Sequence, residues 1–331
     1  MKKFTIIMPV YNVAPYLREC LDSLLAQTVN DPASPSYAAV NWEAICVDDG
    51  STDGSGEILD QYANTDDRFK VFHQKNKGVA NARNRALSVA KGEWVLFVDS
   101  DDILLPGALD VLSKHLAADV DAVLMKRVNF EESLPPVEEN ERQFCKLSTS
   151  KINWDVYFHP IFAAAYRRES VANLQFESLT VGEDRVWYLS ALEQAKQVVA
   201  LDYVGYGYRE REGSAIHSKM TQRKFEDNLK HFERVCEIVG RRPERYAQNV
   251  LRRIGQSLTE YTAMEFVALP KEDKDGCHVF WIEVLEHVKH YPWLPTFQRL
   301  MMNVCAKTKC RLVTMALCYI PFWLKSHGLH R

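Results

Sequence analysis

Three carboxylates directly follow a five-residue apolar run, Trp94–Val98, in the first third of the chain. The β-branched and aromatic side chains of this run predict a strand that is buried on both faces. In open α/β sheets, ligands bind where such strands end. Asp99 and Asp101 are two residues apart, so on extended backbone they project to the same side and repel each other unless a positive group neutralises them.

A divalent cation is the expected counter-charge at this strand end. Mg²⁺ and Mn²⁺ prefer oxygen ligands and take one or two protein carboxylates, which leaves coordination positions for substrate phosphates. A second interpretation stays open, because Asp102 precedes Ile103–Pro106 and could be the N-cap of a following helix. Spacing alone does not separate a metal site from a helix cap.

A second acidic turn, Asp48–Ser51, follows the predicted strand Glu43–Val47. Two carboxylates would repel a pyrophosphate, so we expect this turn to accept hydrogen bonds from a base N–H or from ribose hydroxyls. Its alternative role is to cap the helix that follows. No Gly-x-Gly-x-x-Gly follows the first predicted strand and no Gly-Lys pair occurs, which excludes the dinucleotide-binding motif and the P-loop.

Strands and helices alternate over the first 100 residues. This order predicts parallel strands joined by right-handed crossovers, hence a doubly wound α/β core with both acidic turns on one edge. The predicted strands of this core are 4–10, 43–47, 69–74 and 94–98, and the predicted helices include 16–27, 79–91 and about 107–117. Further strands are predicted at 121–125 and 198–208, exposed loops at 30–41 and 131–141, and helices beyond about residue 221.

The charge of the chain is unevenly distributed. Of its 41 Lys and Arg, seven lie beyond residue 286, where no Asp or Glu occurs. The preceding residues therefore carry 34 basic and 44 acidic side chains, a net charge of -10. An acidic body argues against nucleic acid as a partner, whereas a basic tail favours an anionic neighbour.

The apolar segment Leu312–Leu324, 13 residues long, is flanked by Lys and Arg. It is shorter than the roughly 20 residues that cross a bilayer, so it suits an anionic membrane surface or, alternatively, a final helix packed on the body.

Eight scattered cysteines without a Cys-x-x-Cys pair indicate reduced thiols. Pro9 and Asn12 interrupt the N-terminal apolar run too early for a signal peptide, so we expect a cytoplasmic protein, peripheral on the inner membrane face if the tail binds lipid.

Five motifs together resemble the family 2 glycosyltransferases. The motifs, in chain order, are Thr5–Asn12, Val47–Asp53, Asn76–Gly78 with Ala82–Asn84, Val98–Asp102 and Gly182–Asp184. The resemblance covers about residues 1–215 and implies a GT-A domain, a Rossmann-like mixed sheet with helices on both faces. Residues 216–331 would form a helical C-terminal region with the basic, apolar tail.

The resemblance also implies roles for single residues. Pro9, Tyr11 and Asp49 would hold the nucleotide base, with Tyr11 offering a stacking face and Asp49 accepting from the ring N–H. Arg83 would support the donor pocket, although it could equally be a structural ion pair between two acidic strand ends.

Metal and phosphate contacts follow from the same resemblance. Asp101 would ligate Mn²⁺ or Mg²⁺ directly, and Asp99 would lie near the ribose and a metal-bound water. Arg211, in the polar loop after residue 208, would contact the donor diphosphate, and His217 would ligate the metal or contact a phosphate.

Asp184 matches the family's general base, which removes the proton of the acceptor hydroxyl as it attacks the anomeric carbon. One base opposite the leaving group implies a single displacement with inversion. Alternatively, Glu183 and Asp184 form a helix N-terminus favoured by the helix dipole.

The expected activity is transfer of a sugar from a UDP-sugar to a hydroxyl of a glycan or lipid-linked glycan, in cell-surface polysaccharide synthesis. A nucleotidyltransferase is the alternative enzyme class, but it would be expected to show a glycine-rich, basic triphosphate loop after the first strand. A non-catalytic sugar-nucleotide binding module is the third interpretation, against which Asp184 and the complete set of strand-end carboxylates weigh.

Overall fold

The computed structural model describes most of the chain in two compact units. The described residues are 3–27, 41–135, 144–145, 161–211, 219–241, 262–292 and 296–309, with 243, 251, 254, 311, 314 and 317. The first unit comprises 1–178 and 190–212, and the second comprises 179–189 and 213–331. The division near residue 212 lies close to the boundary expected at 215, but the segment 179–189 belongs by its contacts to the second unit.

The described residues of the first unit form a nine-stranded mixed sheet. Its parallel half has the order β3-β2-β1-β4 and contains the four strands predicted for the core. Every residue of β1, β2 and β4 is buried, which explains their continuous apolar sequences. These strands are β1 (Phe4–Val10), β2 (Trp42–Asp48), β3 (Phe69–His73) and β4 (Trp94–Phe97).

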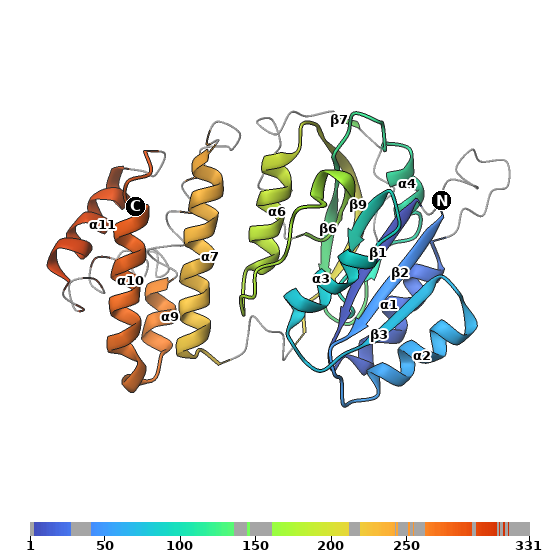
Figure 1. The fold of residues 1–331 in the computed structure, drawn as a ribbon, viewed down its shortest axis with the longest axis horizontal. Coiled ribbons are helices and arrows are strands. Elements are labelled where there is room, and N and C mark those ends of the chain that lie inside the picture. The colour runs from blue at the N-terminus through green and yellow to red at the C-terminus, as the bar shows by residue number, and fades with distance from the viewer. Residues whose placement is uncertain are drawn as a thin grey trace. The chain divides into compact units, whose positions relative to one another are not determined.

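Helices cover both faces of this parallel half. The chain steps outward from β1 to β2 and β3 and then returns past β1 to β4. Because crossovers are right-handed, this reversal places the first two helices on one face and the third on the other, as Figure 1 shows. The helices are α1 (Ala14–Leu25), α2 (Ser55–Thr65) and α3 (Val79–Val89).

The other half of the sheet is mixed. β8 runs antiparallel to both β4 and β6, whereas β9 is parallel to β6 and antiparallel to β5 and β7. The two long strands here were predicted, and the three short ones were not. The elements are β5 (Ile103–Leu104), α4 (Ala108–Ser113), β6 (Ala122–Phe130), β7 (Phe144–Cys145), β8 (Ala164–Arg167), the 3-10 turn η2 (Glu169–Val171) and β9 (Val198–Arg209).

The second unit is helical, as predicted for the C-terminal region. Its core includes Phe225, Phe266 and Trp281, whose ring centroids lie 5.4–6.2 Å apart. No helix of the described residues is long and apolar enough to cross a bilayer. The elements are α6 (Glu183–Gln194), which begins in this unit, α7 (Gln222–Arg241), α9 (Thr262–Ala268), η6 (Lys271–Asp273), α10 (Lys274–Val288) and α11 (Thr296–Thr308).

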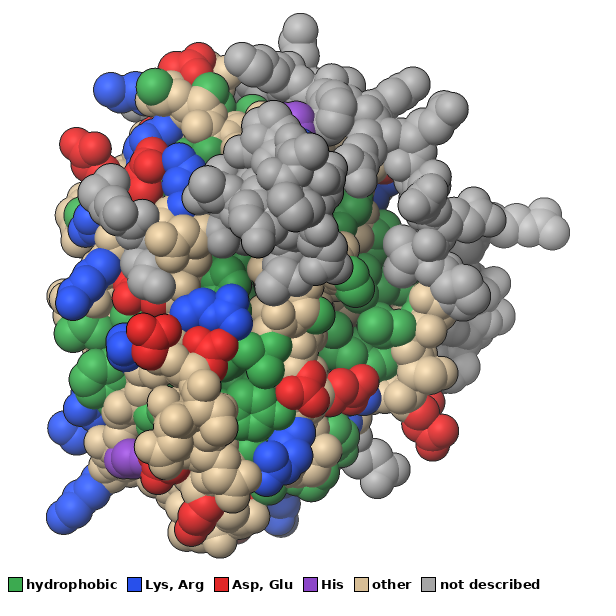
Figure 2. Space-filling view, turned by 90° about the vertical axis from the view of Figure 1, so that its right-hand side faces the viewer, with side chains coloured by type: hydrophobic (Ala, Val, Ile, Leu, Met, Phe, Trp, Pro, Cys, Tyr) green, Lys and Arg blue, Asp and Glu red, His purple; other side chains and the backbone are tan. Residues whose placement is uncertain are grey.

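Acidic and basic side chains are interspersed on the face of the molecule shown in Figure 2, without a broad area of one sign among its described residues. The predicted membrane segment Leu312–Leu324 lies outside the described residues, apart from single helical positions at Thr314 and Leu317. The predicted loop 30–41 is also outside them, except for Asn41.

Candidate active site

The acidic turn after β2 is bonded to the loop that precedes α3. Asp49 is buried, and its Oδ1 accepts the N–H of Lys77 at 2.8 Å and the side-chain amide of Gln74 at 2.8 Å. Its Oδ2 accepts the N–H of Gly78 at 2.8 Å. A carboxylate offers about four acceptor positions, so about one remains for an external donor such as a base N–H.

Gly50 lets these two loops approach closely. Its φ of +79° lies in the left-handed region, and a Cβ there would stand 3.0 Å from the backbone N of Asn76. Asp48 also serves the turn, because its Oδ1 accepts the N–H of Ser51 at 2.9 Å. The N-cap of α2 is Gly54, so the alternative that these aspartates cap the next helix is wrong.

Tyr11 lies in the loop that follows β1, against the same turn. The N–H of Asp49 donates to the carbonyl of Val10 at 2.8 Å, which ties the turn to the end of β1. Asn12 has a φ of 50°, and its N–H donates to Ser51 Oγ at 3.1 Å. The Tyr11 side chain is 50% exposed, as a stacking surface for a base requires, while Pro9 is buried within β1.

Asp99, just beyond β4, pairs with an arginine from α3. Asp99 Oδ1 lies 2.9 Å from an Nη of Arg83, whose side chain is only 3% exposed. The Arg83 guanidinium lies over the rings of Phe162 and Phe176, at 5.7 and 5.4 Å from their centroids. Arg83 is therefore a buried ion-pair partner of Asp99, which is compatible with both roles expected for it.

Asp101 pairs with an arginine that follows β9. Its Oδ2 lies 2.5 Å from Nε of Arg211, and both side chains are about one-fifth exposed. The Arg211 guanidinium also lies 5.4 Å from the ring centroid of Tyr16, on α1. The fold thus joins an expected metal ligand and an expected phosphate contact that are 110 residues apart in the chain.

Asp102 has a different role from the helix cap considered for it. It is 1% exposed, and its carboxylate accepts the Tyr206 hydroxyl at 2.6 Å and the N–H of Arg209 at 2.8 Å. Burial, with the nearby Asp99 and Asp101 carboxylates, raises its pKa well above the usual value. The helix-cap interpretation is wrong, because β5 follows Asp102 and the N-cap of α4 is Gly107.

A hard divalent cation suits the oxygen donors of this turn. Asp99 and Asp101 supply two carboxylates, and Mg²⁺ or Mn²⁺ completes its shell with phosphate oxygens and water. Within the described residues, no group of three or more His, Cys, Asp or Glu forms a metal-binding cluster, so the protein ligands among them would be few. His217 lies outside the described residues.

Asp184 lies in the first turn of α6, within the second unit. Its Oδ1 accepts the N–H of Arg185 at 2.7 Å, and the preceding Glu183 is buried. α7 supports the segment before it, since Asp227 accepts the N–H of Thr180 at 3.1 Å. This placement fits the helix N-terminus interpretation of Asp184.

Gly182 packs closely against α7 in the same unit. Its φ is +77°, and a Cβ there would lie 2.4 Å from the His231 ring, so only glycine fits. His231 is buried, and burial holds its pKa well below the usual value. The turn before α6 is therefore packed directly against a buried imidazole ring.

Comparison with known proteins identifies the family. The model of Glycosyl transferase family 2 matches residues 5–174, about half of the chain, and the chain belongs to this family. The sequence is 34% identical over 222 residues to the uncharacterized glycosyltransferase EpsJ of Bacillus subtilis, covering 63% of this chain and 62% of that protein. It is 34% identical over 225 residues to a poly(ribitol-phosphate) beta-glucosyltransferase of Bacillus spizizenii, covering 64% of this chain and 33% of that protein.

A solved structure shares the fold along nearly the whole chain. The crystal structure of S. aureus TarS 1-349 in complex with UDP-GlcNAc superposes with a TM-score of 0.72 at 21% identity. The match covers 99% of this chain and 93% of that chain, which confirms the GT-A fold and the helical C-terminal region. The chain spans only about a third to three-fifths of the length of the two sequence relatives.

Proposed function

We propose that this protein is a metal-dependent, inverting glycosyltransferase that moves a sugar from a UDP-sugar to a hydroxyl of a glycan or lipid-linked glycan. The observation that carries the proposal is the set of paired charges after β4. Arg83 and Arg211 compensate Asp99 and Asp101 there. A metal–diphosphate complex brings a cation for Asp101 and an anion for Arg211, so it can replace that pairing while Asp99 keeps Arg83, and no charge is left alone.

The donor contacts follow from this arrangement. Tyr11 offers its exposed ring to the base, and Asp49 uses its remaining acceptor position for the base N–H. Asp101 would ligate Mn²⁺ or Mg²⁺, with Asp99 holding a water of the ion, and Arg211 would hold a phosphate. The bound ion would stabilise the charge of the leaving diphosphate.

Asp184 would accept the proton of the acceptor hydroxyl. A carboxylate within hydrogen-bond reach can do so as the oxygen attacks the anomeric carbon. The bond from that carbon to the diphosphate breaks as the new bond forms from the opposite side, so the configuration inverts. Pro9 would shape the base site from within β1, and His217 would add a metal or phosphate contact.

The relatives support this substrate class. One is named as acting on poly(ribitol-phosphate), and the matched TarS structure holds UDP-GlcNAc. We infer a UDP-sugar donor and a cell-surface polymer or its lipid-linked precursor as acceptor. A cytoplasmic protein held at the inner membrane face by its basic tail would meet such an acceptor.

A donor screen tests the proposal. Nucleotide sugars are incubated with the protein and Mn²⁺, and release of nucleoside diphosphate is measured. One UDP-sugar should be hydrolysed faster than the others, and the matching nucleoside diphosphate should raise the melting temperature only when metal is present. Absence of hydrolysis and of stabilisation for every nucleotide sugar would contradict the proposed function.

A further inference from the structure

We propose that Tyr206 and Arg209 of β9, acting through Asp102, are positioning residues that fix the backbone of the turn Asp99–Asp102. This inference deepens the proposed function and rests on it, because the turn would hold the metal and the donor. Neither β9 residue need touch the donor. Each would act by setting where the carboxylates of Asp99 and Asp101 point.

The three side chains are buried to a degree that is costly for polar groups. Relative exposure is 1% for Asp102, 0% for Tyr206 and 7% for Arg209. A buried carboxylate, phenol or guanidinium loses its hydration and is tolerated only with hydrogen-bond partners in place. Such a network is rigid when it is fully satisfied.

The network reaches the main chain on both sides of Ser100. The Tyr206 hydroxyl donates to Asp102 Oδ2 at 2.6 Å and accepts the N–H of Asp99 at 3.2 Å. Arg209 donates its N–H to Asp102 Oδ1 at 2.8 Å and its Nε to the carbonyl of Asp101 at 2.9 Å. The backbone at both predicted metal contacts is therefore bonded to one strand.

The β9 side chains are themselves held by other elements of the first unit. The Arg209 guanidinium lies 2.5 Å from Glu19 Oε2 and 4.4 Å from the ring centroid of Phe130. The Tyr206 ring is stacked on Phe162, with centroids 5.9 Å apart. β9 consequently acts as a rigid support, whereas the carboxylate of Asp101 faces the partly exposed Arg211, which a donor complex would displace.

Binding of UDP at graded Mn²⁺ concentrations tests this inference. The main variant is Tyr206→Phe, which keeps the ring and removes the hydroxyl that joins Asp99 to Asp102. We expect the affinity for UDP in saturating Mn²⁺ to fall at least about tenfold, the size of one hydrogen bond to a charged group. Affinity measured in EDTA should change much less, because the base contacts remain.

Tyr203→Phe is the matched control. Tyr203 lies on the same strand, and its hydroxyl donates to the carbonyl of Pro106 at 3.2 Å, away from the acidic turn. Its removal should leave the Mn²⁺ dependence unchanged. Arg209→Lys is the second variant, since it keeps the main-chain N–H bond to Asp102 but loses the Nε bond to the carbonyl of Asp101. If circular dichroism shows that Tyr206→Phe does not fold, the Mn²⁺ dependence of Arg209→Lys decides the question.

The outcomes separate the two proposals. If the wild-type protein does not bind UDP with Mn²⁺, the proposed function fails and this inference fails with it. If the wild type binds and the folded Tyr206→Phe protein binds with the same Mn²⁺ dependence, only the positioning role is wrong. Equal losses in Mn²⁺ and in EDTA, or an equal loss in Tyr203→Phe, would also overturn it, because they indicate a general effect on β9.

Discussion

Two acidic turns follow parallel strands of the same sheet, and their carboxylates are held in different ways. After β2, Asp49 accepts two main-chain N–H groups and one side-chain amide, all uncharged. After β4, Asp99 and Asp101 each pair with an arginine. Amide donors fix a carboxylate without neutralising it, whereas guanidinium groups cancel its charge.

This difference indicates that the two acidic turns have different roles. Under the proposed function, the turn after β2 would accept a neutral donor group, such as a base N–H. The turn after β4 is neutralised by arginines, and it would exchange the partly exposed Arg211 for a cation and a diphosphate. Substitutions should therefore disturb folding at the first turn and charge-dependent binding at the second.

Asp101→Ala should have the largest effect on binding. It removes the proposed metal ligand and leaves Arg211 without its partner, so we expect metal-dependent binding of UDP to be abolished. Calorimetry with and without Mn²⁺ measures this. Asp202→Ala, which removes a half-exposed aspartate of β9, is the control and should bind as the wild type does. UDP binding with unchanged Mn²⁺ dependence in Asp101→Ala would rule out the metal assignment.

Asp184→Asn tests whether Asp184 acts in sugar transfer and not in donor binding, which is assigned to the two acidic turns. The amide keeps the shape of the side chain but cannot accept a proton, so transfer should fall by about 10²-fold or more. UDP affinity should stay close to the wild-type value. Weakened UDP affinity with intact turnover would instead make Asp184 a structural residue of the α6 N-terminus.

Asp49→Asn should show that the turn after β2 is structural. One carboxylate oxygen becomes an NH₂ that faces an N–H donor of Lys77 or Gly78, so the free energy of unfolding should fall by about 1–3 kcal/mol. Chemical denaturation measures the loss. Asp101→Asn is the comparison, because Arg211 is partly exposed and an asparagine oxygen can still accept from it. A larger destabilisation by Asp101→Asn than by Asp49→Asn would reverse the proposed division.

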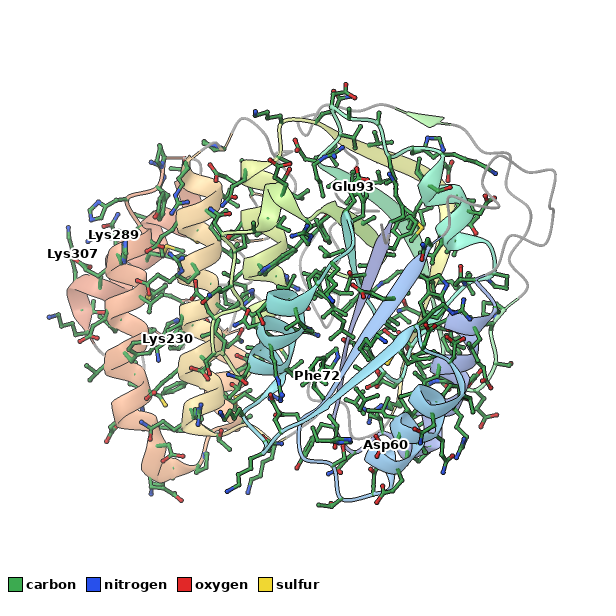
Figure 3. The ribbon with its side chains drawn as sticks, turned by 45° about the vertical axis from the view of Figure 1, so that its right-hand side comes forward. Asp60, Phe72, Glu93, Lys230, Lys289 and Lys307 are labelled. Carbon is green, nitrogen blue, oxygen red and sulfur yellow. The ribbon has the colours of Figure 1, made fainter. Side chains whose placement is uncertain are left out.

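Substitution of His73, which lies beside the acidic turn after β2, should have the smallest effect on stability. Its Nδ1 lies 2.8 Å from Asp48 Oδ2, and its Nε2 lies 3.2 Å from Oδ1 of Asp60. Asp60 lies on α2, where Figure 3 labels it. The hydrogen bond to Asp48 is the main cause that raises the His73 pKa. Protonated His73 therefore stabilises the folded state below about pH 6.5, the unfolded value, and this contribution is lost as the pH rises through the folded pKa.

The His73→Gln variant checks that pH dependence. The side chain of His73 is half exposed, so solvent screens the pair and the change should be small. The difference in melting temperature between the wild type and His73→Gln should be greatest near pH 5 and shrink toward pH 8. A difference that grows with pH would contradict the ion pair.

Much of the fold could be predicted because its signals are local. The parallel strands are apolar runs, and each is followed by polar turn residues and a helical repeat. β5 and β8 were missed, since strands of two and four residues carry too short a pattern and depend on partners far away. Ile103 and Leu104 resembled a helix start after Asp102, but they pair with Gly207 and Tyr206 of β9.

The site residues stay predictions. The strand-end aspartates could be chosen because each follows a predicted strand, and Arg211 was chosen from the family resemblance. Which of them pair could not be predicted, because Asp101 and Arg211 meet only when β9 lies beside β5. Tyr206 and Arg209 were missed for the same reason, although a strand over 198–208 was predicted.

The metal requirement of UDP binding tests the central claim most directly. UDP is titrated into the wild-type protein in Mn²⁺ and in EDTA, and the two dissociation constants are compared by calorimetry. The account predicts clear binding in Mn²⁺ and binding at least about tenfold weaker in EDTA, the size of one interaction with a charged group. Equal affinity in the two buffers would contradict an acidic turn that exchanges Arg211 for a metal–diphosphate complex.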